Sequence, residues 1–152
     1  MEQSIKQVIL IVEDSDDDYE STVRALQRSG NLKNRILRCE SGDEALDYLY
    51  GQGKFADRVE FPIPSVILLD LNMHGTDGRM VLRKIKNDDA VKDIPVVVLT
   101  TSNDAKDIDA CYKDGANTYI HKPVDLDGFF KAIKQLKEYW FEIAILPKQK
   151  SK

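Results

Sequence analysis

The stretch Val8-Ile9-Leu10-Ile11-Val12-Glu13-Asp14 places two carboxylates directly after five apolar residues, most of them β-branched. A continuous apolar run of this length is typical of a strand that is covered on both faces, as in a parallel sheet. Similar runs predict strands at 66–69 and 96–99, and weaker patterns predict strands at 35–39 and 118–121. The chain is therefore expected to contain a sheet whose central strands are buried on both sides.

Between these runs, apolar residues recur at helical spacing. The pattern predicts helices at 16–29, 41–50, 78–86 and 105–114, an extended connection at 51–64, and a last helix from about 126 with Asp125 as its N-cap. Alternating strands and helices imply right-handed crossovers and helices on both faces of the sheet. The predicted fold class is α/β, a doubly wound five-stranded parallel sheet, and 152 residues suffice for one such domain.

Composition argues against several classes of function. The net charge of −4, from 22 Lys and Arg against 26 Asp and Glu, disfavours a nucleic-acid partner, which requires clustered cations. No apolar run reaches the roughly 18 residues of a membrane span, and no secretory signal opens the chain, so a cytoplasmic location without membrane contact is expected. Cys39 and Cys111 lack the spacing of a zinc or redox motif and are expected to stay reduced.

Polar residues follow four of the five predicted strands, at the point where each strand ends. They are Glu13 and Asp14, Asp70, Thr100 and Thr101, and Lys122. In an open parallel sheet these ends converge on one edge, where ligands bind. Clustered carboxylates without His or Cys select Mg²⁺, and a hydroxyl and an ammonium beside them suit phosphoryl oxygens. Because a carboxylate can itself attack phosphorus, the set indicates metal-dependent phosphoryl transfer onto Asp70.

Each of these residues also has a simpler interpretation, since Asp and Thr often follow strands as caps and turn residues. Spacing alone leaves both interpretations open. The run Asp16-Asp17-Asp18 is predicted to be a capping turn favoured by the helix dipole, not a further set of metal ligands. His74 is predicted to be a surface loop residue, and His121 a packing or partner-facing one.

Five motifs together resemble the response-regulator receiver domain. They are Val-Glu-Asp at 12–14, Leu-Asp-Leu-Asn-Met at 69–73, Gly75 to Gly78, Leu-Thr-Thr at 99–101 and Tyr-Ile-His-Lys-Pro at 119–123. The match in order and spacing covers residues 6–140. It implies the flavodoxin-like sheet of the chemotaxis regulators, with strand order 2-1-3-4-5.

The resemblance also implies roles for individual residues in a two-component phosphorelay. Asp70 would accept a phosphoryl group from a sensor histidine kinase. Mg²⁺ would be held by Glu13, Asp14, Asp70 and the backbone carbonyl of Asn72. Phosphoryl binding and switching would fall to Thr100, Thr101, Tyr119 and Lys122, with a cis peptide before Pro123. Two positions depart from the family pattern: Glu13 stands where many relatives have Asp, and His74 where most have Pro.

The C-terminal part is expected to act through protein contact. Residues 1–147 are predicted to form one receiver domain that includes a C-terminal helix, and 148–152 a disordered basic tail. The apolar stretch 139–147 indicates an interface, and we expect a homodimer through the last helix, this C-terminal segment and the face formed by helix 105–114, strand 118–121 and the last helix. Its contact residues would be Phe130, Trp140, Phe141 and Ile143. With the long 51–64 connection, this extension resembles the stand-alone regulators of bacterial phytochrome-type kinases, acting on an unknown downstream protein.

Two other functions compete with signalling. A Mg²⁺-dependent phosphohydrolase with an aspartyl nucleophile usually has a second Asp two residues later as its acid, where this chain has Asn72. A flavin- or nucleotide-binding protein is disfavoured by the acidic first loop, which would repel phosphate. The expectation is a signalling phosphoacceptor and not an enzyme.

Overall fold

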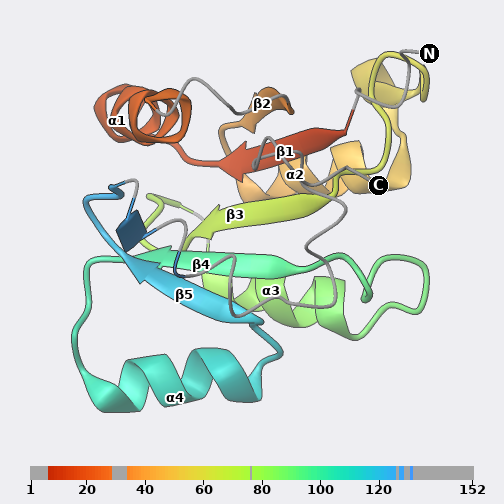
Figure 1. Cartoon of the computed structure of the whole chain (residues 1–152). Coiled ribbons are helices and arrows are strands. Elements are labelled where there is room, and N and C mark those ends of the chain that lie inside the picture. The colour runs from red at the N-terminus through yellow and green to blue at the C-terminus, as the bar shows by residue number, and fades with distance from the viewer. Residues whose placement is uncertain (1–6, 29–33, 76, 126, 129–130, 132–152) are drawn as a thin grey trace, which may run out of the picture.

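The computed structural model describes residues 7–28, 34–75, 77–125, 127–128 and 131. Within them, five parallel strands form one sheet in the order β2-β1-β3-β4-β5 (Figure 1). The strands are β1 (Val8–Val12), β2 (Arg35–Cys39), β3 (Val66–Asp70), β4 (Val96–Thr100) and β5 (Thr118–His121). The helices are α1 (Asp16–Gln27), α2 (Gly42–Tyr50), α3 (Gly78–Lys86) and α4 (Ala105–Lys113), with a short 3₁₀ turn η2 (Gly53–Phe55).

The predicted strands and strand order are confirmed, and four predicted helices are found within two residues of the expected bounds. For the last helix, the backbone N–H of Gly128 donates to Asp125 Oδ1 at 2.6 Å, as expected of an N-cap. Apart from residues 127–128 and 131, that helix lies outside the described residues, and so do its predicted interface residues. They are Phe130, Trp140, Phe141 and Ile143. The predicted domain bounds therefore stay predictions.

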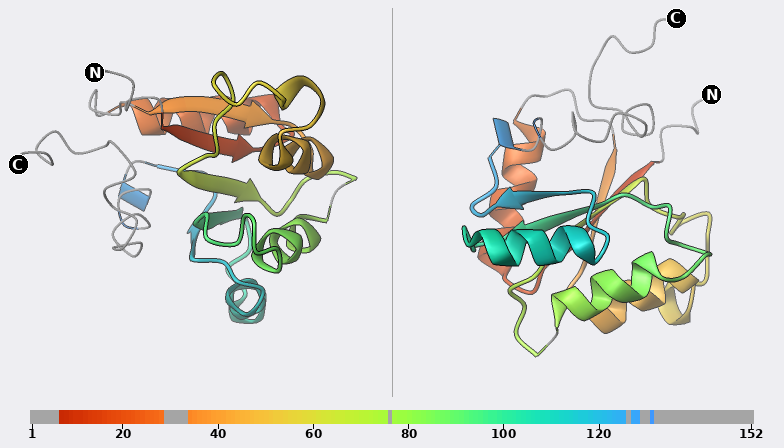
Figure 2. Two further views of the ribbon diagram at one scale, coloured as in Figure 1. Left: turned by 90° about the vertical axis from the view of Figure 1, so that its right-hand side faces the viewer. Right: turned by 90° about the horizontal axis from the view of Figure 1, so that it is seen from below.

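The sheet is buried on both faces, which explains the continuous apolar runs. One face of β1, with Leu10 and Val12, packs in a cluster with residues of α2 and α3. The other face, with Ile9 and Ile11, packs with Ala25 and other residues of α1. Figure 2 shows α1 on one side of the sheet and α2 and α3 on the other. All residues of β1, β3 and β4 are buried. The sequences of these strands therefore show a continuous apolar run and no alternation of apolar and polar residues.

The connection from α2 to β3 is more structured than the predicted extended segment. Gly51 ends α2 with a φ of 65°, a conformation that favours glycine. Arg58 then donates to the carbonyls of Tyr48 and Leu49 at the end of the helix and to that of Phe55. Phe55 is buried against the ring of Tyr48 at 4.9 Å between centroids. Apolar burial and satisfied helix carbonyls thus give this segment a fixed path.

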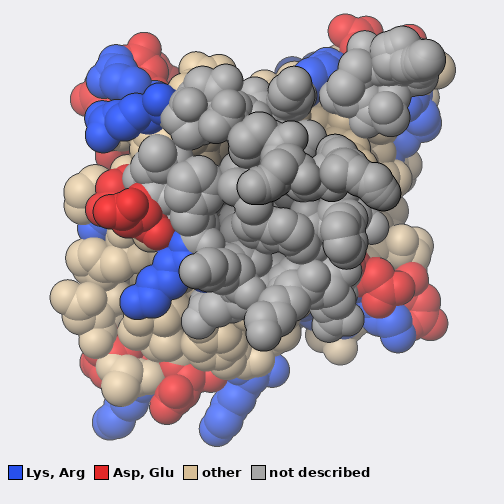
Figure 3. Space-filling model, in the orientation of Figure 1, with Lys and Arg blue, Asp and Glu red and all other residues tan. Residues whose placement is uncertain are grey.

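Side chains of both signs alternate over the described part of the face shown in Figure 3, with no extended basic area. No helix of the described chain combines the length and the apolar character that crossing a membrane requires.

Candidate functional site

The carboxyl ends of β1 and β3 lie side by side at the centre of the sheet, where the winding of the chain reverses direction. Glu13 and Asp14 follow β1, and Asp70 is the last residue of β3. One carboxylate oxygen from each lies within 4.8 Å of the others. The predicted convergence of these three acids is confirmed.

Asp70 is buried, with 1% of its surface exposed. Its Oδ1 accepts hydrogen bonds from the backbone N–H of Asn72 at 2.9 Å and from Lys122 Nζ at 3.2 Å. Its Oδ2 is buried and has no hydrogen-bond partner among the described residues. Since a buried polar atom without a partner is costly, this oxygen is arranged to meet a ligand that the chain itself does not supply.

Lys122, directly after β5, brings a positive charge to the acids. Its Nζ lies 3.1 Å from Glu13 Oε1, 2.8 Å from Asp18 Oδ2 and 3.2 Å from Asp70 Oδ1. Burial alone would lower the pKa of Lys122, but the hydrogen bond to Asp18 and the charges of Asp70 and Glu13 outweigh it and raise the pKa. The following peptide, Lys122–Pro123, is cis as predicted.

Asp18 was predicted to belong to a solvated capping turn, and this prediction was incomplete. Ser15 is the N-cap of α1 and accepts from the backbone N–H of Asp18, which therefore sits in the first turn. The Asp18 side chain contacts Lys122 near the end of β1. The sequence signal that could have found this contact is the cap, because the third residue after an N-cap turns back over the preceding strand end.

The negative charge of Glu13 is unfavourable in this arrangement. Its residue is fully buried, and its pKa is raised to about 7. Burial contributes most, followed by the adjacent carboxylate of Asp70, while Lys122 acts in the opposite direction. One ammonium is thus insufficient for the acids that surround it, and a further cation would be stabilised here.

Asp14 is held by the loop that follows β3. The backbone N–H of His74 donates to Asp14 Oδ2 at 2.8 Å, and His74 Nδ1 lies 3.3 Å from the same oxygen. Burial opposes the charge of Asp14, but these bonds to His74 outweigh it and lower the pKa of Asp14. The His74 ring is exposed, as predicted, and is not part of the acid cluster. Its backbone contact with Asp14 was not predicted.

The predicted hydroxyl and aromatic residues lie on or directly after the two neighbouring strands, Thr100 at the end of β4, Thr101 after it and Tyr119 within β5. Thr100 is buried and its Oγ1 accepts from Ser102 N at 3.0 Å, whereas Thr101 is exposed. Tyr119 is half-buried, with its ring against that of Tyr112 at 6.2 Å between centroids.

Asn72 makes a link between loops that sequence reasoning missed. Its side-chain Oδ1 accepts from the backbone N–H of Thr101 at 3.0 Å. His121 Nε2 in turn lies 2.9 Å from the Thr101 carbonyl oxygen, so the loops after β3 and β4 are joined to β5. The predicted ligand role of the Asn72 carbonyl stays a prediction.

The acid cluster fits a hard divalent cation. It offers oxygen ligands alone, from three carboxylates, and two of them, Glu13 and Asp70, each have a buried oxygen without a hydrogen-bond partner among the described residues. Mg²⁺ prefers such ligands and takes few carboxylates beside its waters. Glu13, Asp14 and Asp70 are the residues that would hold it.

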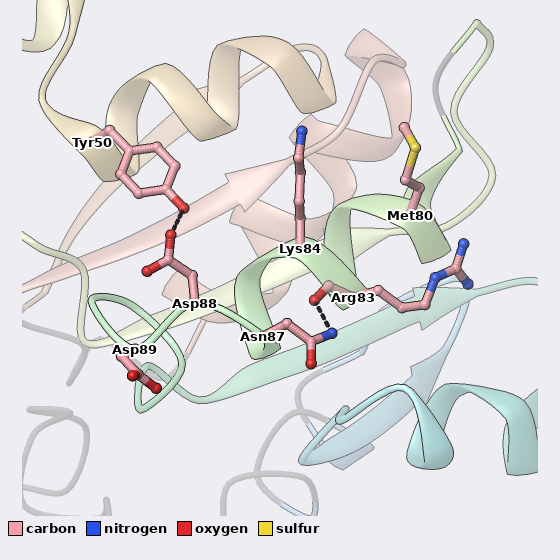
Figure 4. Close-up of a pocket in the computed structure, with 7 residues that line it drawn as sticks. All are labelled: Tyr50, Met80, Arg83, Lys84, Asn87, Asp88 and Asp89. Carbon is pink, nitrogen blue, oxygen red and sulfur yellow. Dashed lines mark hydrogen bonds between the residues drawn. The ribbon is translucent and has the colours of Figure 1, made fainter.

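A surface pocket of about 720 Å³ lies elsewhere, between the end of α2 and the exposed side of α3 (Figure 4). It is lined by Tyr50, Met80, Arg83, Lys84, Asn87, Asp88 and Asp89. The Tyr50 hydroxyl donates to Asp88 Oδ2, so this carboxylate is already engaged. None of the strand-end residues lines the pocket, and we assign the chemistry to the acid cluster.

Comparison with known proteins points to one family. Residues 9–134 match the sequence model of the response regulator receiver domain. The response regulator Rcp1 of Synechocystis sp. is 36% identical over 146 residues, which cover 96% of this chain and 97% of that protein. The solved bacteriophytochrome response regulator AtBRR is 38% identical with a TM-score of 0.80, covering 94% of this chain and 99% of the other. A Mn²⁺-bound form of Rcp1 is 37% identical with a TM-score of 0.71, covering 93% and 99%.

Proposed function

The chain belongs to the response regulator receiver domain family of two-component signalling, and on that premise we propose that Asp70 is its phosphoacceptor. The observation that carries the proposal is the buried, unpartnered Oδ2 of Asp70, at the point where three carboxylates and Lys122 meet. Receiver domains interact with histidine kinases, so the donor is a phosphohistidine.

Group transfer requires a donor bond to break as an acceptor bond forms. The bond from nitrogen to phosphorus in the kinase phosphohistidine breaks while an Asp70 oxygen bonds to phosphorus, and the leaving imidazole takes up a proton. A bound Mg²⁺ would offset the charge of the acids and of the phosphoryl oxygens. Lys122 already contacts Asp70 and is placed to pair with a phosphoryl oxygen once the carboxylate is esterified.

Thr100, Thr101 and Tyr119 would convert this charge into a change of shape. A phosphoryl group adds negative charge and acceptor oxygens, which favours movement of the Thr100 hydroxyl toward it. Thr100 is buried at the end of β4, so its displacement would open space beside β5, where Tyr119 is half-buried. We propose Thr100, Thr101 and Tyr119 as this switch.

The partners follow from the relatives. AtBRR is by name a bacteriophytochrome response regulator, which favours a phytochrome-type histidine kinase as the partner of this chain. We also propose a cytoplasmic location, a homodimer through the C-terminal segment and a protein as the downstream target. A phosphohydrolase is not favoured, because Asn72 stands where its acid would be and the Asn72 side chain is engaged with Thr101.

The test is phosphorylation by a small donor. Wild type, Asp70→Asn and Asp77→Asn are incubated with acetyl phosphate and Mg²⁺, and their intact masses are measured. Asp77 caps α3 with its side chain, a role that Asn also performs, so Asp77→Asn is the matched control. We expect one added phosphoryl group in wild type and control and none in Asp70→Asn. Equal labelling of all three would refute the assignment.

A further inference from the structure

We propose that Arg38 is a positioning residue for the metal-binding acids, which it orients through the backbone of the loop that carries them. The inference rests on the function proposed above, since it concerns how Glu13 and Asp14 are presented to a cation. Arg38 lies on β2, whose residues pair with those of β1.

The loop between β1 and α1 needs outside support. Carboxylates occupy five of the six consecutive positions from 13 to 18, which form this loop and the start of α1, with Ser15 as the exception. Like charges this close repel one another and favour an open loop. Lys122 offsets the inward-facing acids Glu13 and Asp18, as described above. The outward part of the loop needs a second cation.

Arg38 provides that cation in a directed form. Its Nε donates to the backbone carbonyl of Glu13 at 3.0 Å, and its Nη1 donates to Asp16 Oδ1 at 2.9 Å. The guanidinium lies over the Tyr19 ring, 4.8 Å from the centroid. One side chain thus contacts the backbone of the loop and two residues of the first turn of α1, Asp16 and Tyr19.

The contact with the Glu13 carbonyl is the decisive one. That carbonyl belongs to the peptide group that joins Glu13 to Asp14, so its orientation decides where the Asp14 side chain starts. The N–H of Glu13 is held separately by the Cys39 carbonyl at 3.0 Å. Adjacent residues of β2 therefore hold both backbone groups of Glu13.

Burial of the guanidinium supports a specific role. The Arg38 side chain is 18% exposed, and its Nη2 is buried without a hydrogen-bond partner among the described residues. An arginine that served only as a surface charge would keep all its donors in water. Lysine could supply the charge but not the fork of donors that reaches the carbonyl and Asp16 together.

Positioning and simple charge predict opposite effects on metal binding. Removal of a positive charge near a cation site strengthens cation binding by Coulomb's law. Loss of a group that orients the ligands weakens it, by about tenfold or more. The sign of the change in Mg²⁺ affinity therefore separates the two roles.

The experiment measures metal affinity in the full chain without any phosphoryl donor. Wild type, Arg38→Met, Arg38→Lys, Arg35→Met and Asp14→Asn are titrated with Mg²⁺ by NMR and with Mn²⁺ by electron paramagnetic resonance. Arg35→Met is the matched control, because Arg35 lies at the opposite end of β2 and donates to the Glu60 carbonyl. Far-UV circular dichroism and urea unfolding verify that each variant is folded.

We expect Arg38→Met to bind about tenfold more weakly, Arg38→Lys to fall between it and wild type, and Arg35→Met to bind as wild type does. If Arg38→Met fails to fold, Arg38→Lys provides the test, and its failure to weaken binding overturns the proposal. Unchanged or tighter binding by a folded Arg38→Met also overturns it. If wild type binds the metal and Asp14→Asn does not, the metal binds at the acid cluster, whatever the effect of Arg38. If wild type binds no metal, both proposals fall.

Discussion

Removing the charge of Glu13 should stabilise the metal-free protein, although it deletes a residue of the functional site. The pKa of Glu13 is raised from 4.5 to about 7, chiefly by burial and by the neighbouring Asp70. Between these pH values the folded state holds more protons than the unfolded state does. The free energy of unfolding therefore falls as the pH rises through this window and stays low above it.

The magnitude follows from the size of the change in pKa. Each pKa unit corresponds to about 1.4 kcal/mol, so the loss approaches about 3 kcal/mol above pH 7. Glu13→Gln keeps an oxygen for the Ser15 N–H, which lies 3.2 Å from Glu13 Oε2, and has no proton to lose. The difference in unfolding free energy between variant and wild type should grow by about 3 kcal/mol across the window.

The assay is urea unfolding followed by circular dichroism at a series of pH values, in excess chelator. Because the charge of Asp70 helps to raise the pKa of Glu13, Asp70→Asn should show the same trend. The exposed Glu60→Gln serves as a control that follows wild type. Saturating Mg²⁺ should restore the free energy of unfolding of wild type but not change that of Glu13→Gln, because a ligand stabilises only the state that binds it. A difference that stays constant within about 1 kcal/mol across the window would refute the reasoning.

Three further predictions concern the site and its support. Lys122→Ala should still bind Mg²⁺, and metal titration should show tighter binding than in wild type, because the ammonium that competes for three acids is gone. Loss of metal binding would contradict this interpretation of the Lys122 contacts. Gly78→Ala should lower the free energy of unfolding in urea by about 1 to 3 kcal/mol, although alanine is the better helix former. The reason is steric, because the added Cβ would lie 2.8 Å from Leu71 Cα and 2.9 Å from the Asp70 carbonyl oxygen. Its control, Gly53→Ala, meets open space and should cost only the strain of a φ of 61°, about 1 to 2 kcal/mol. Arg58→Met should destabilise by about 2 kcal/mol through lost bonds to the carbonyls at the end of α2, whereas the exposed Lys54→Met should change thermal stability little.

The fold was predictable because its signals are local or topological. Apolar runs such as 8–12 and 96–99 are continuous because helices cover both faces of the sheet, and alternation of strands and helices leaves few arrangements open. Convergence of Asp14, Asp70 and Lys122 followed from the same rule, since parallel strands end at one edge. The 51–64 connection was less predictable, because its path depends on where Arg58 and Phe55 find partners.

The sequence by itself determined the fold class, the family and the acids of the site, because these depend on pattern and on the direction of strands. Only the tertiary structure decided which side chains share each charge. Three contacts join residues from different elements: the ion pair of Asp18 with Lys122, the bond from the His74 amide to Asp14, and the bond from Arg38 to the Glu13 carbonyl. Such contacts depend on distances of a few ångströms between loops, and no periodicity along the chain encodes those distances.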